Sequence, residues 1–396
     1  MTRTLRPSGA ALPGPVVGPV AGAVAPPRLV LMNPGPVVAD ERVRAALAGP
    51  DLCHREPEFT ALMDRVRDRV TRICGGGPEH TSLILTGSGT AAVEATIASA
   101  VPADGGLLAL DNGHYGERMY EIAGAYGLRR RRLEFGWGRP LDLAAVERAL
   151  VADPALSHVS VVHHETSTGM LNDIAGIARI ARRHGREVVV DAVSSVGAED
   201  LGVERDGIDW LAGSANKCLE GMPGLSFVTA RRVAFARVTG HPPRSYSLDL
   251  GRHYTAQETA RAPAFTPAVP AFYAFDAALE LALAEGVAGR AARYGRLATL
   301  LREGLEGLGF ALLLPPQHRA VGLTAVGLPD GISYDQLHGP LKAAGFVIYA
   351  AQGPLAERHF RLSTLGALTT EDISGFLDAL ARVPAVAARE REGGSR

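Results

Sequence analysis

The sequence predicts an α/β fold: a large domain with a mostly parallel seven-stranded sheet, followed by a smaller α+β C-terminal domain. Between residues 81 and 230, short β-rich runs alternate with helical stretches, which is typical of a parallel sheet wrapped by helices. After about residue 270 the chain becomes rich in Ala, Leu and Arg, and shorter strands and helices follow. At 396 residues, the chain also exceeds what one hydrophobic core usually serves.

The expected elements follow from the periodicity of apolar residues and from the turn residues between them. In the large domain we expect strands at 82–85, 106–110, 131–135, 158–163, 187–191, 210–213 and 225–228, and helices at 90–100, 117–126, 143–151 and 174–184. In the small domain we expect a helical stretch at 271–308, strands at 310–314, 324–328, 346–350 and 360–364, and a last helix at 371–382. The expected boundaries are 1–27 for a disordered extension, 28–270 for the large domain, 271–388 for the small domain and 389–396 for a frayed tail.

Composition and charge exclude several classes of protein. The formal net charge of −1 gives no sign of the basic surface that binding to nucleic acid requires, so no such partner is expected. No stretch reaches the roughly 18 to 20 uncharged apolar residues that a spanning helix needs, so no membrane is expected. The cysteines Cys53, Cys74 and Cys218 cannot all pair and lack metal-ligand spacing. We therefore expect a cytoplasmic protein without a metal site.

Polar residues follow four of the predicted strands, at 86–90, 112–116, 164–169 and 191–195. In open α/β sheets, ligands bind at the carboxyl ends of the strands, so these segments are candidates for a shared site. The first, Thr-Gly-Ser-Gly-Thr, opens a predicted helix, where backbone N–H groups, hydroxyls and the helix dipole would face an anion. A plain glycine-rich turn with a Ser or Thr N-cap gives the same pattern, so both interpretations stay open.

Asp191 and Lys217 follow successive strands and are expected at the same edge of the sheet. Asp191 ends an apolar run, where a carboxylate is costly without a cationic partner such as a protonated pyridine nitrogen. A helix N-cap is the alternative. Lys217 is the only lysine in residues 1–221, and a primary amine, unlike a guanidinium, can form an imine. A surface lysine is the alternative. Tyr115 at the same edge is suited to stack on an aromatic ligand, and a surface tyrosine is the alternative for it.

Six motifs, in this order and spacing, carry a resemblance that spans residues 29–385. They are Asn-Pro-Gly-Pro at 33–36, Gly-Ser-Gly-Thr-Ala-Ala-Val-Glu-Ala at 87–95, Asn-Gly-His-Tyr-Gly-Glu-Arg-Met at 112–119, His-Glu-Thr-Ser-Thr-Gly-Met-Leu-Asn at 164–172, Asp-Ala-Val-Ser-Ser at 191–195 and Ser-Ala-Asn-Lys-Cys at 214–218. The sequence resembles the class V aminotransferases of pyridoxal-phosphate fold type I. Within them it is most similar to the 2-aminoethylphosphonate:pyruvate aminotransferases.

The resemblance implies a role for each matching residue. Lys217 would hold pyridoxal 5'-phosphate as a Schiff base and act as general base, and Asp191 would keep the ring nitrogen protonated. Arg361 would clamp the anionic group of the substrate, with Gly35 and Arg244 as further substrate-binding residues. The remaining cofactor contacts would be Ser88, Gly89, Thr90 and Asn216 at the phosphate, Tyr115 stacked on the ring, Thr168 at the ring hydroxyl, and Thr266 at the phosphate of the neighbouring subunit. The role of Thr266 implies a homodimer with shared active sites.

The implied reaction converts 2-aminoethylphosphonate and pyruvate to phosphonoacetaldehyde and alanine. Two departures bear on the substrate: segment 53–59 is typical of the wider family, and Ala-Ala-Gln at 350–352 stands where the phosphonate enzymes carry Pro-Gly-Lys. Segment 245–250 favours the phosphonate branch, and Arg244 beside it is a candidate for the missing charge. The alternatives are an alanine/serine:glyoxylate or pyruvate aminotransferase, a pyridoxal-phosphate lyase that releases ammonia from a hydroxylated aminophosphonate, and a non-catalytic ligand-binding protein.

Overall fold

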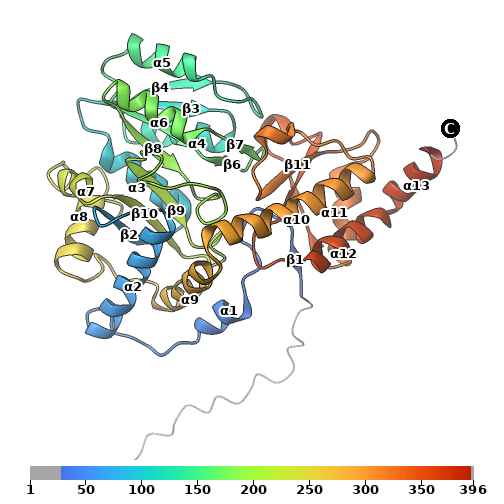
Figure 1. Ribbon diagram of the computed structural model, residues 1–396, viewed down its shortest axis with the longest axis horizontal. Helices are drawn as coiled ribbons and strands as arrows, with labels where there is room; N and C mark the ends of the chain where they lie inside the picture. The colour runs from blue at the N-terminus through green and yellow to red at the C-terminus, as the bar shows by residue number, and fades with distance from the viewer. Residues whose placement is uncertain (1–27, 394–396) are drawn as a thin grey trace, which may run out of the picture.

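A computed structural model describes residues 28–393, so the predicted extension at 1–27 and residues 394–396 lie outside the described residues. The large domain is built on a seven-stranded sheet of order β2-β10-β9-β8-β5-β3-β4, with helices on both faces (Figure 1). Its strands are β2 (His80–Thr86), β3 (Gly106–Asp111), β4 (Arg129–Glu134), β5 (His158–Val162), β8 (Glu187–Asp191), β9 (Trp210–Ser214) and β10 (Leu225–Arg231). The predicted fold class is confirmed, and each predicted strand of the large domain is present with slightly shifted ends.

Strand direction places the carboxyl ends of six strands at one edge of this sheet. Strands β4, β3, β5, β8 and β9 pair in parallel. Strand β10 is antiparallel to both of its neighbours, β9 and β2, so β2 points the same way as β9. The loops that follow these six strands therefore meet at the same edge, where parallel α/β sheets bind their ligands.

The two faces of the sheet carry separate hydrophobic cores. One face is covered by α3 (Gly89–Ala100), α4 (His114–Ala125), α7 (Arg232–Val238) and α8 (Leu250–Tyr254), and the other by α2 (Pro57–Ile73), α5 (Leu143–Ala152), α6 (Ile174–Arg183) and α9 (Val269–Glu285). Val189 packs into the first core, whereas its neighbours Val188 and Val190 pack into the second. Because both faces are buried, central strands such as β8 are largely apolar and recognisable in the sequence, whereas the edge strand β4 is rich in arginine and mostly exposed.

The smaller domain packs helices against a three-stranded sheet of order β11-β14-β13. A parallel pair, β1 with β12, brings the N-terminal segment beside this domain. Its elements are β1 (Val30–Leu31), α10 (Val287–Gly307), β11 (Leu323–Gly327), α11 (Tyr334–Ala343), β12 (Phe346–Val347), β13 (Tyr349–Ala350), β14 (His359–Ser363), α12 (Thr370–Ala381) and α13 (Pro384–Gly393). Elsewhere in the described chain, α1 (Glu41–Ala46) precedes α2, and a small pair, β6 (His164–Glu165) and β7 (Met170–Leu171), follows β5.

Three predicted elements of the small domain were wrong in detail. Segment 310–314 is not a strand, since only Leu312 forms an isolated bridge, to Val326. Segment 346–350 is divided between two sheets, as β12 and β13. The helical stretch 271–308 is two helices, because Gly286 between them adopts a φ of 73° that ends α9. In addition, α13 continues to Gly393, into the segment where the sequence predicted a frayed tail.

The break at Gly286 bears on the domain boundary. Helix α9 packs into the core of the large domain through Phe272, Phe275 and Leu279, whereas α10 contributes Leu297 and Leu301 to the core of the small domain. Figure 1 shows α10 extending from the large domain towards the small one. We propose that the boundary lies near Gly286 rather than after residue 270. Within residues 28–393, no helix combines the length and apolar character needed to cross a bilayer.

Candidate active site

A cavity of about 210 Å³ lies where β8 and β9 end. Asp191 is the last residue of β8 and Ser214 the last of β9, and both line the cavity. The parallel course of these strands brings the loops that follow them together. The structure thereby gathers seven of the predicted site residues around one space: Ser88, Gly89, Thr90, Tyr115, Asp191, Asn216 and Lys217.

The N-terminus of α3 forms one wall of this cavity. Its N-cap residue, Ser88, makes no side-chain capping hydrogen bond, so its hydroxyl is available to a ligand. A Cβ atom at Gly89 would come within 2.7 Å of Val193 Cγ2, so this position requires glycine. Uncapped N–H groups, a hydroxyl and the positive end of the helix dipole together suit a phosphate group.

Lys217 enters the cavity from the turn after β9. Its Nζ donates a hydrogen bond to the Pro34 carbonyl at 2.5 Å. A Cβ atom at Gly35 would collide with the same amine, so Gly35 allows the close approach. Burial lowers the pKa of Lys217 to about 8. At pH 7 about a tenth of such amines are neutral, far more than for an ordinary lysine.

Asp191 faces the cavity from the end of β8, and its cationic partner is Arg118 of α4. Arg118 Nη2 donates to Asp191 Oδ2 at 2.9 Å, and Arg118 Nη1 donates to Thr90 Oγ1 at 3.0 Å. The same guanidinium lies over the Tyr115 ring, 4.5 Å from its centroid. The sequence argument that Asp191 needs a cation is thus met within the chain by a residue that the sequence analysis did not single out.

Glu165, in the motif at 164–172, is a second residue that supports the site and that no local pattern indicated. It is fully buried, and its Oε2 accepts hydrogen bonds from the backbone N–H groups of Tyr115 (3.0 Å) and Gly116 (3.1 Å). Its Oε1 accepts from the N–H (3.1 Å) and hydroxyl (2.6 Å) of Ser167. Burial raises the pKa of Glu165 to about 7, whereas the hydrogen bonds from these donors oppose that rise. Glu165 therefore fixes the first turn of α4, which carries Tyr115 and Arg118.

Arg361 reaches the site from β14 of the small domain and is 4% exposed. Its Nη1 donates to the Thr166 carbonyl (3.3 Å) and to Gln352 Oε1 (3.2 Å), and its Nε donates to the Ala350 carbonyl (3.1 Å). Burial lowers the pKa of this guanidinium, and electrostatic attraction to the nearby Tyr115 side chain opposes that shift. Thr166 and Tyr115 both line the cavity, so Arg361 lies at its margin.

Three predicted residues lie elsewhere. Thr168 is buried, and its hydroxyl donates to the Glu165 carbonyl (3.3 Å) and accepts from the Met170 N–H (3.3 Å). Arg244 Nη1 donates to the carbonyls of Ala98 (2.7 Å) and Val101 (2.8 Å), at the C-terminus of α3. Thr266 is exposed and lines a second cavity with Thr86. None of the three lines the cavity that holds Lys217.

The residues around the cavity fit pyridoxal phosphate. Three polar atoms of lining residues, Arg118 Nε, His164 Nε2 and Ser214 Oγ, are buried without a hydrogen-bond partner among the described residues. Each part of that group has a counterpart here. The uncapped helix N-terminus suits the phosphate, and the partly neutral amine suits the aldehyde. The strand-end carboxylate suits the ring nitrogen, and the aromatic ring of Tyr115 suits the ring face.

Comparison with known proteins shows the family of this chain. The family model described as aminotransferase class-V matches residues 43–353. A 2-aminoethylphosphonate–pyruvate transaminase of Syntrophobacter fumaroxidans is 39% identical over 355 residues, covering 88% of this chain and 95% of that protein. One of Vibrio cholerae is 36% identical over 358 residues, covering 89% and 96%. The crystal structure of an alanine–glyoxylate aminotransferase from Nostoc sp. is similar with a TM-score of 0.86 and 28% identity, covering 91% of this chain and 97% of the other. The chain therefore belongs to the class V aminotransferase family and is a transaminase.

Proposed function

We propose that this transaminase uses pyridoxal phosphate to transfer the amino group of 2-aminoethylphosphonate to pyruvate, which yields phosphonoacetaldehyde and alanine. The likeness to the transaminases of Syntrophobacter fumaroxidans and Vibrio cholerae, which extends over most of both chains, supports the choice of substrates. The single observation that carries the catalytic part is the amine of Lys217, which reaches one cavity shared with Asp191 and the N-terminus of α3.

Each group of the cavity has a part in this proposal. Bound pyridoxal phosphate would supply an electron sink that stabilises negative charge on the substrate carbon after its proton leaves. Lys217 would hold the cofactor and then move that proton, for which its lowered pKa is suited. Asp191, flanked by Arg118, would accept a hydrogen bond from the ring nitrogen and favour its protonated form. Ser88, Gly89, Thr90 and Asn216 would hold the phosphate, and Tyr115 would stack on the ring.

Arg361 would bind the anionic end of each substrate in turn. A planar guanidinium can engage a carboxylate or a phosphonate through two parallel hydrogen bonds. Gln352 already accepts a hydrogen bond from Arg361, so it lies beside the place where that anion would bind. Arg244 is engaged with backbone carbonyls of α3 instead, so the structure offers no support for its sequence-based role as a second phosphonate ligand.

The proposal extends to the oligomeric state, the contact of Thr168 with the cofactor, and the location of the protein. We propose a homodimer in which Thr266 contacts the phosphate of the neighbouring subunit, supported by its exposure and by its distance from its own chain's cavity lining. Thr168 would reach the ring hydroxyl only after releasing its present partners. The three free cysteines support a reducing, cytoplasmic location.

A half-reaction screen tests the substrates. The purified holoenzyme is mixed with one amine at a time, and the absorbance of its cofactor is followed without any keto acid. We expect the largest kcat/KM with 2-aminoethylphosphonate, and pyruvate as the preferred acceptor in the second half-reaction. A preference of roughly tenfold or more for alanine with glyoxylate would instead favour the activity named for the Nostoc neighbour. Free ammonia released without a keto acid would indicate a lyase.

A further inference from the structure

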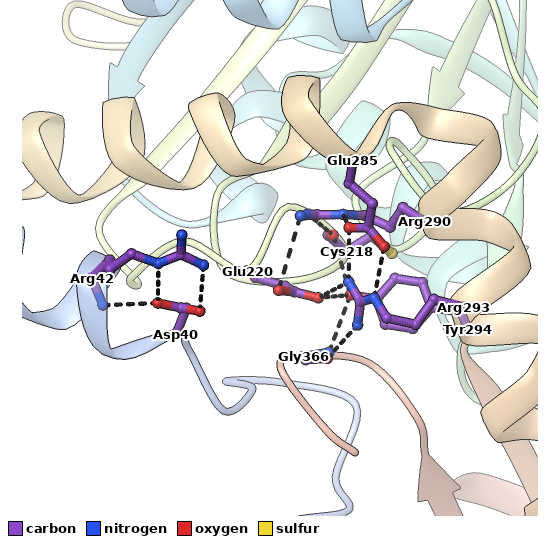
Figure 2. A network of polar contacts seen from close by, with 9 residues as sticks. All are labelled: Asp40, Arg42, Cys218, Glu220, Glu285, Arg290, Arg293, Tyr294 and Gly366. Carbon is purple, nitrogen blue, oxygen red and sulfur yellow. Dashed lines mark hydrogen bonds and ion pairs between the residues drawn. The ribbon is translucent and has the colours of Figure 1, made fainter. Parts of the chain in front are cut away.

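Cys218 and Glu220, in the turn that carries Lys217, contact a network of charged side chains from α9 and α10 (Figure 2). Glu220 Oε1 accepts hydrogen bonds from Tyr294 Oη (2.5 Å) and Arg293 Nη2 (2.7 Å). Arg290 Nη1 donates to the Cys218 carbonyl at 3.0 Å, and Tyr294 Oη also lies 3.3 Å from that carbonyl. Side chains of α10 therefore hold both Cys218, which follows Lys217, and Glu220, which lies three positions after it.

The network is partly buried, since Arg293 and Glu285 are about one quarter exposed, and its charges balance. Arg290 is 2% exposed, Glu220 6% and Tyr294 fully buried. Glu285, the last residue of α9, accepts from Arg290 Nε (2.8 Å) and Arg293 Nε (2.7 Å). Two carboxylates thus face two guanidiniums, and removing the charge of Glu220 would leave both guanidiniums facing the single carboxylate of Glu285.

Glu220 also closes the turn through its own backbone. Its N–H donates to the Lys217 carbonyl at 2.9 Å, and its φ of 59° lies in the left-handed region. A residue other than glycine adopts this conformation when its surroundings enforce it. The side-chain contacts of Glu220 provide that enforcement, so they determine where the backbone of Lys217 lies.

The same network reaches the small domain. Arg293 Nη1 donates to the Gly366 carbonyl (3.2 Å), and the Gly366 N–H donates to Tyr294 Oη (3.2 Å). Gly366 lies in the loop after β14, the strand that carries Arg361. Glu220 does not line the cavity with Lys217, so it has no part in the proposed chemistry there. Its contacts instead connect the backbone at the amine to the loop beside the anion-binding arginine.

We infer that Glu220 is a positioning residue, whose carboxylate, held by Tyr294 and Arg293, fixes the turn of Lys217 relative to the small domain that carries Arg361. The inference rests on the proposed roles of Lys217 and Arg361. Glu220 keeps the amine at the right distance from the cofactor and from the anionic end of the substrate while touching neither. A displacement of about 1 Å at a reacting group can cost on the order of a hundredfold in rate.

Glu220→Gln is the main test, because the amide keeps the size of the side chain and one acceptor but loses the charge that faces Arg293. Tyr294→Phe is the second variant, which removes only the hydroxyl shared by Glu220, Cys218 and Gly366. The matched control is Glu187→Gln. Glu187 accepts from the Trp210 indole (2.8 Å) and from Arg237 (2.8 Å), and it begins β8, at the edge of the sheet opposite Asp191.

Three measurements are made on each holoenzyme: the pH midpoint of the cofactor absorbance, kcat with KM for both substrates, and the melting temperature. A fourth measures how fast pyridoxal phosphate can be trapped by borohydride on Lys217 in protein stripped of cofactor. In Glu220→Gln and Tyr294→Phe we expect the midpoint to move by about half a pH unit or more. We also expect trapping to slow several-fold and kcat to fall roughly tenfold or more. Glu187→Gln should lower only the melting temperature.

The result that would contradict this inference differs from the result that would contradict the proposed function. If Glu220→Gln and Tyr294→Phe lose stability but keep the midpoint, trapping rate, kcat and KM of wild type, Glu220 is a structural clamp and the inference is wrong. If Glu220→Gln does not fold, Tyr294→Phe decides between the same two results. A wild-type chain that traps no cofactor on Lys217 would overturn the proposed function, and this inference with it.

Discussion

At Lys217, burial changes the chemistry available to an amine. It lowers the pKa to about 8, from an ordinary value of 10.5. Only the neutral amine attacks a carbonyl, so the rate of cofactor attachment should rise as the pH increases through the pKa of the folded protein. The same amine would stay protonated to a much higher pH on an exposed side chain.

We therefore expect cofactor-free protein to attach pyridoxal phosphate at a rate that rises with pH, with a midpoint near 8. The measurement is borohydride trapping at a series of pH values, followed by mapping of the modified peptide. Lys217→Arg is the control. It should keep its fold but trap nothing and retain less than about 1% of turnover, since arginine stays protonated and forms no imine. A midpoint near 10.5 in wild type would mean that the amine is not desolvated.

At Asp191, the carboxylate ends an apolar strand and pairs with the guanidinium of Arg118. Asp191→Asn should still allow attachment to Lys217 but reduce turnover by several orders of magnitude, since an amide does not favour a protonated ring nitrogen. It also leaves Arg118 Nη2 without its carboxylate, so cofactor affinity should fall. Single-turnover kinetics and equilibrium dialysis measure the two effects. Turnover within about threefold of wild type would make Asp191 a structural partner of Arg118.

At the scale of elements, the first turn of α4 depends on a residue far away in the sequence. The backbone N–H groups of Tyr115 and Gly116 have no carbonyl of their own helix to bind, and Glu165 supplies the acceptor. The turn at 165–168 also offers the Thr166 carbonyl to Arg361. One buried carboxylate thereby supports the aromatic ring proposed for the cofactor and the arginine proposed for the substrate.

Glu165→Gln should therefore weaken both stability and function. Its amide NH₂ cannot accept a hydrogen bond, and leaving buried donors unsatisfied costs about 1 to 3 kcal/mol. Urea unfolding should show that loss, and KM for both substrates should rise because Tyr115 and Arg361 lose support. The matched control is Asp173→Asn, which replaces a carboxylate that caps α6 through the Gly176 N–H. Equal stability losses with KM unchanged in both variants would limit Glu165 to a structural role.

The strands of the large domain were predictable because local patterns indicate them, whereas the helices α1, α2, α7 and α8 were not predicted. Strands such as β8 are short apolar runs bounded by polar residues, and covered parallel sheets require that pattern. The short strands β12 and β13 were not predictable, because pairing with β1 and β14, rather than composition, divides segment 346–350. Gly286 was missed as a break because similar helical composition continues on both sides.

The residues of the candidate site were likewise predictable only in part. Ser88, Asp191 and Lys217 follow strands whose carboxyl ends share an edge, so order in the sequence was enough to group them. Arg118 and Glu165 act through partners 73 and about 50 residues away, which no local spacing reveals. Arg244 was assigned from its neighbours in sequence, yet its side chain points to the end of α3.

At the scale of the whole molecule, the two domains are joined where the proposed chemistry needs a fixed geometry. The core of the large domain positions Asp191 and the N-terminus of α3, whereas the small domain carries Arg361. The network around Glu220 links the turn after β9 to α10 and to the loop after β14 (Figure 2). Relative motion of the domains would change the distance between the amine of Lys217 and the guanidinium of Arg361, so we expect this network to affect catalysis although Glu220 does not line the cavity.

The proposed dimer leads to a prediction that depends on linkage between assembly and cofactor binding. If Thr266 contacts the phosphate bound in the neighbouring subunit, cofactor binds the dimer more tightly than the monomer, and by reciprocity it must tighten the dimer. Sedimentation at a series of protein concentrations should therefore give a lower dimer dissociation constant with pyridoxal phosphate than without it.

Thr266→Ala should reduce that difference and raise the cofactor dissociation constant several-fold. Thr239→Ala, which alters another exposed threonine whose hydroxyl binds only a local carbonyl, should change neither. A cofactor effect on assembly that is equal in wild type and Thr266→Ala would place the contact between subunits at another residue, and a monomer active at all concentrations would refute the shared site.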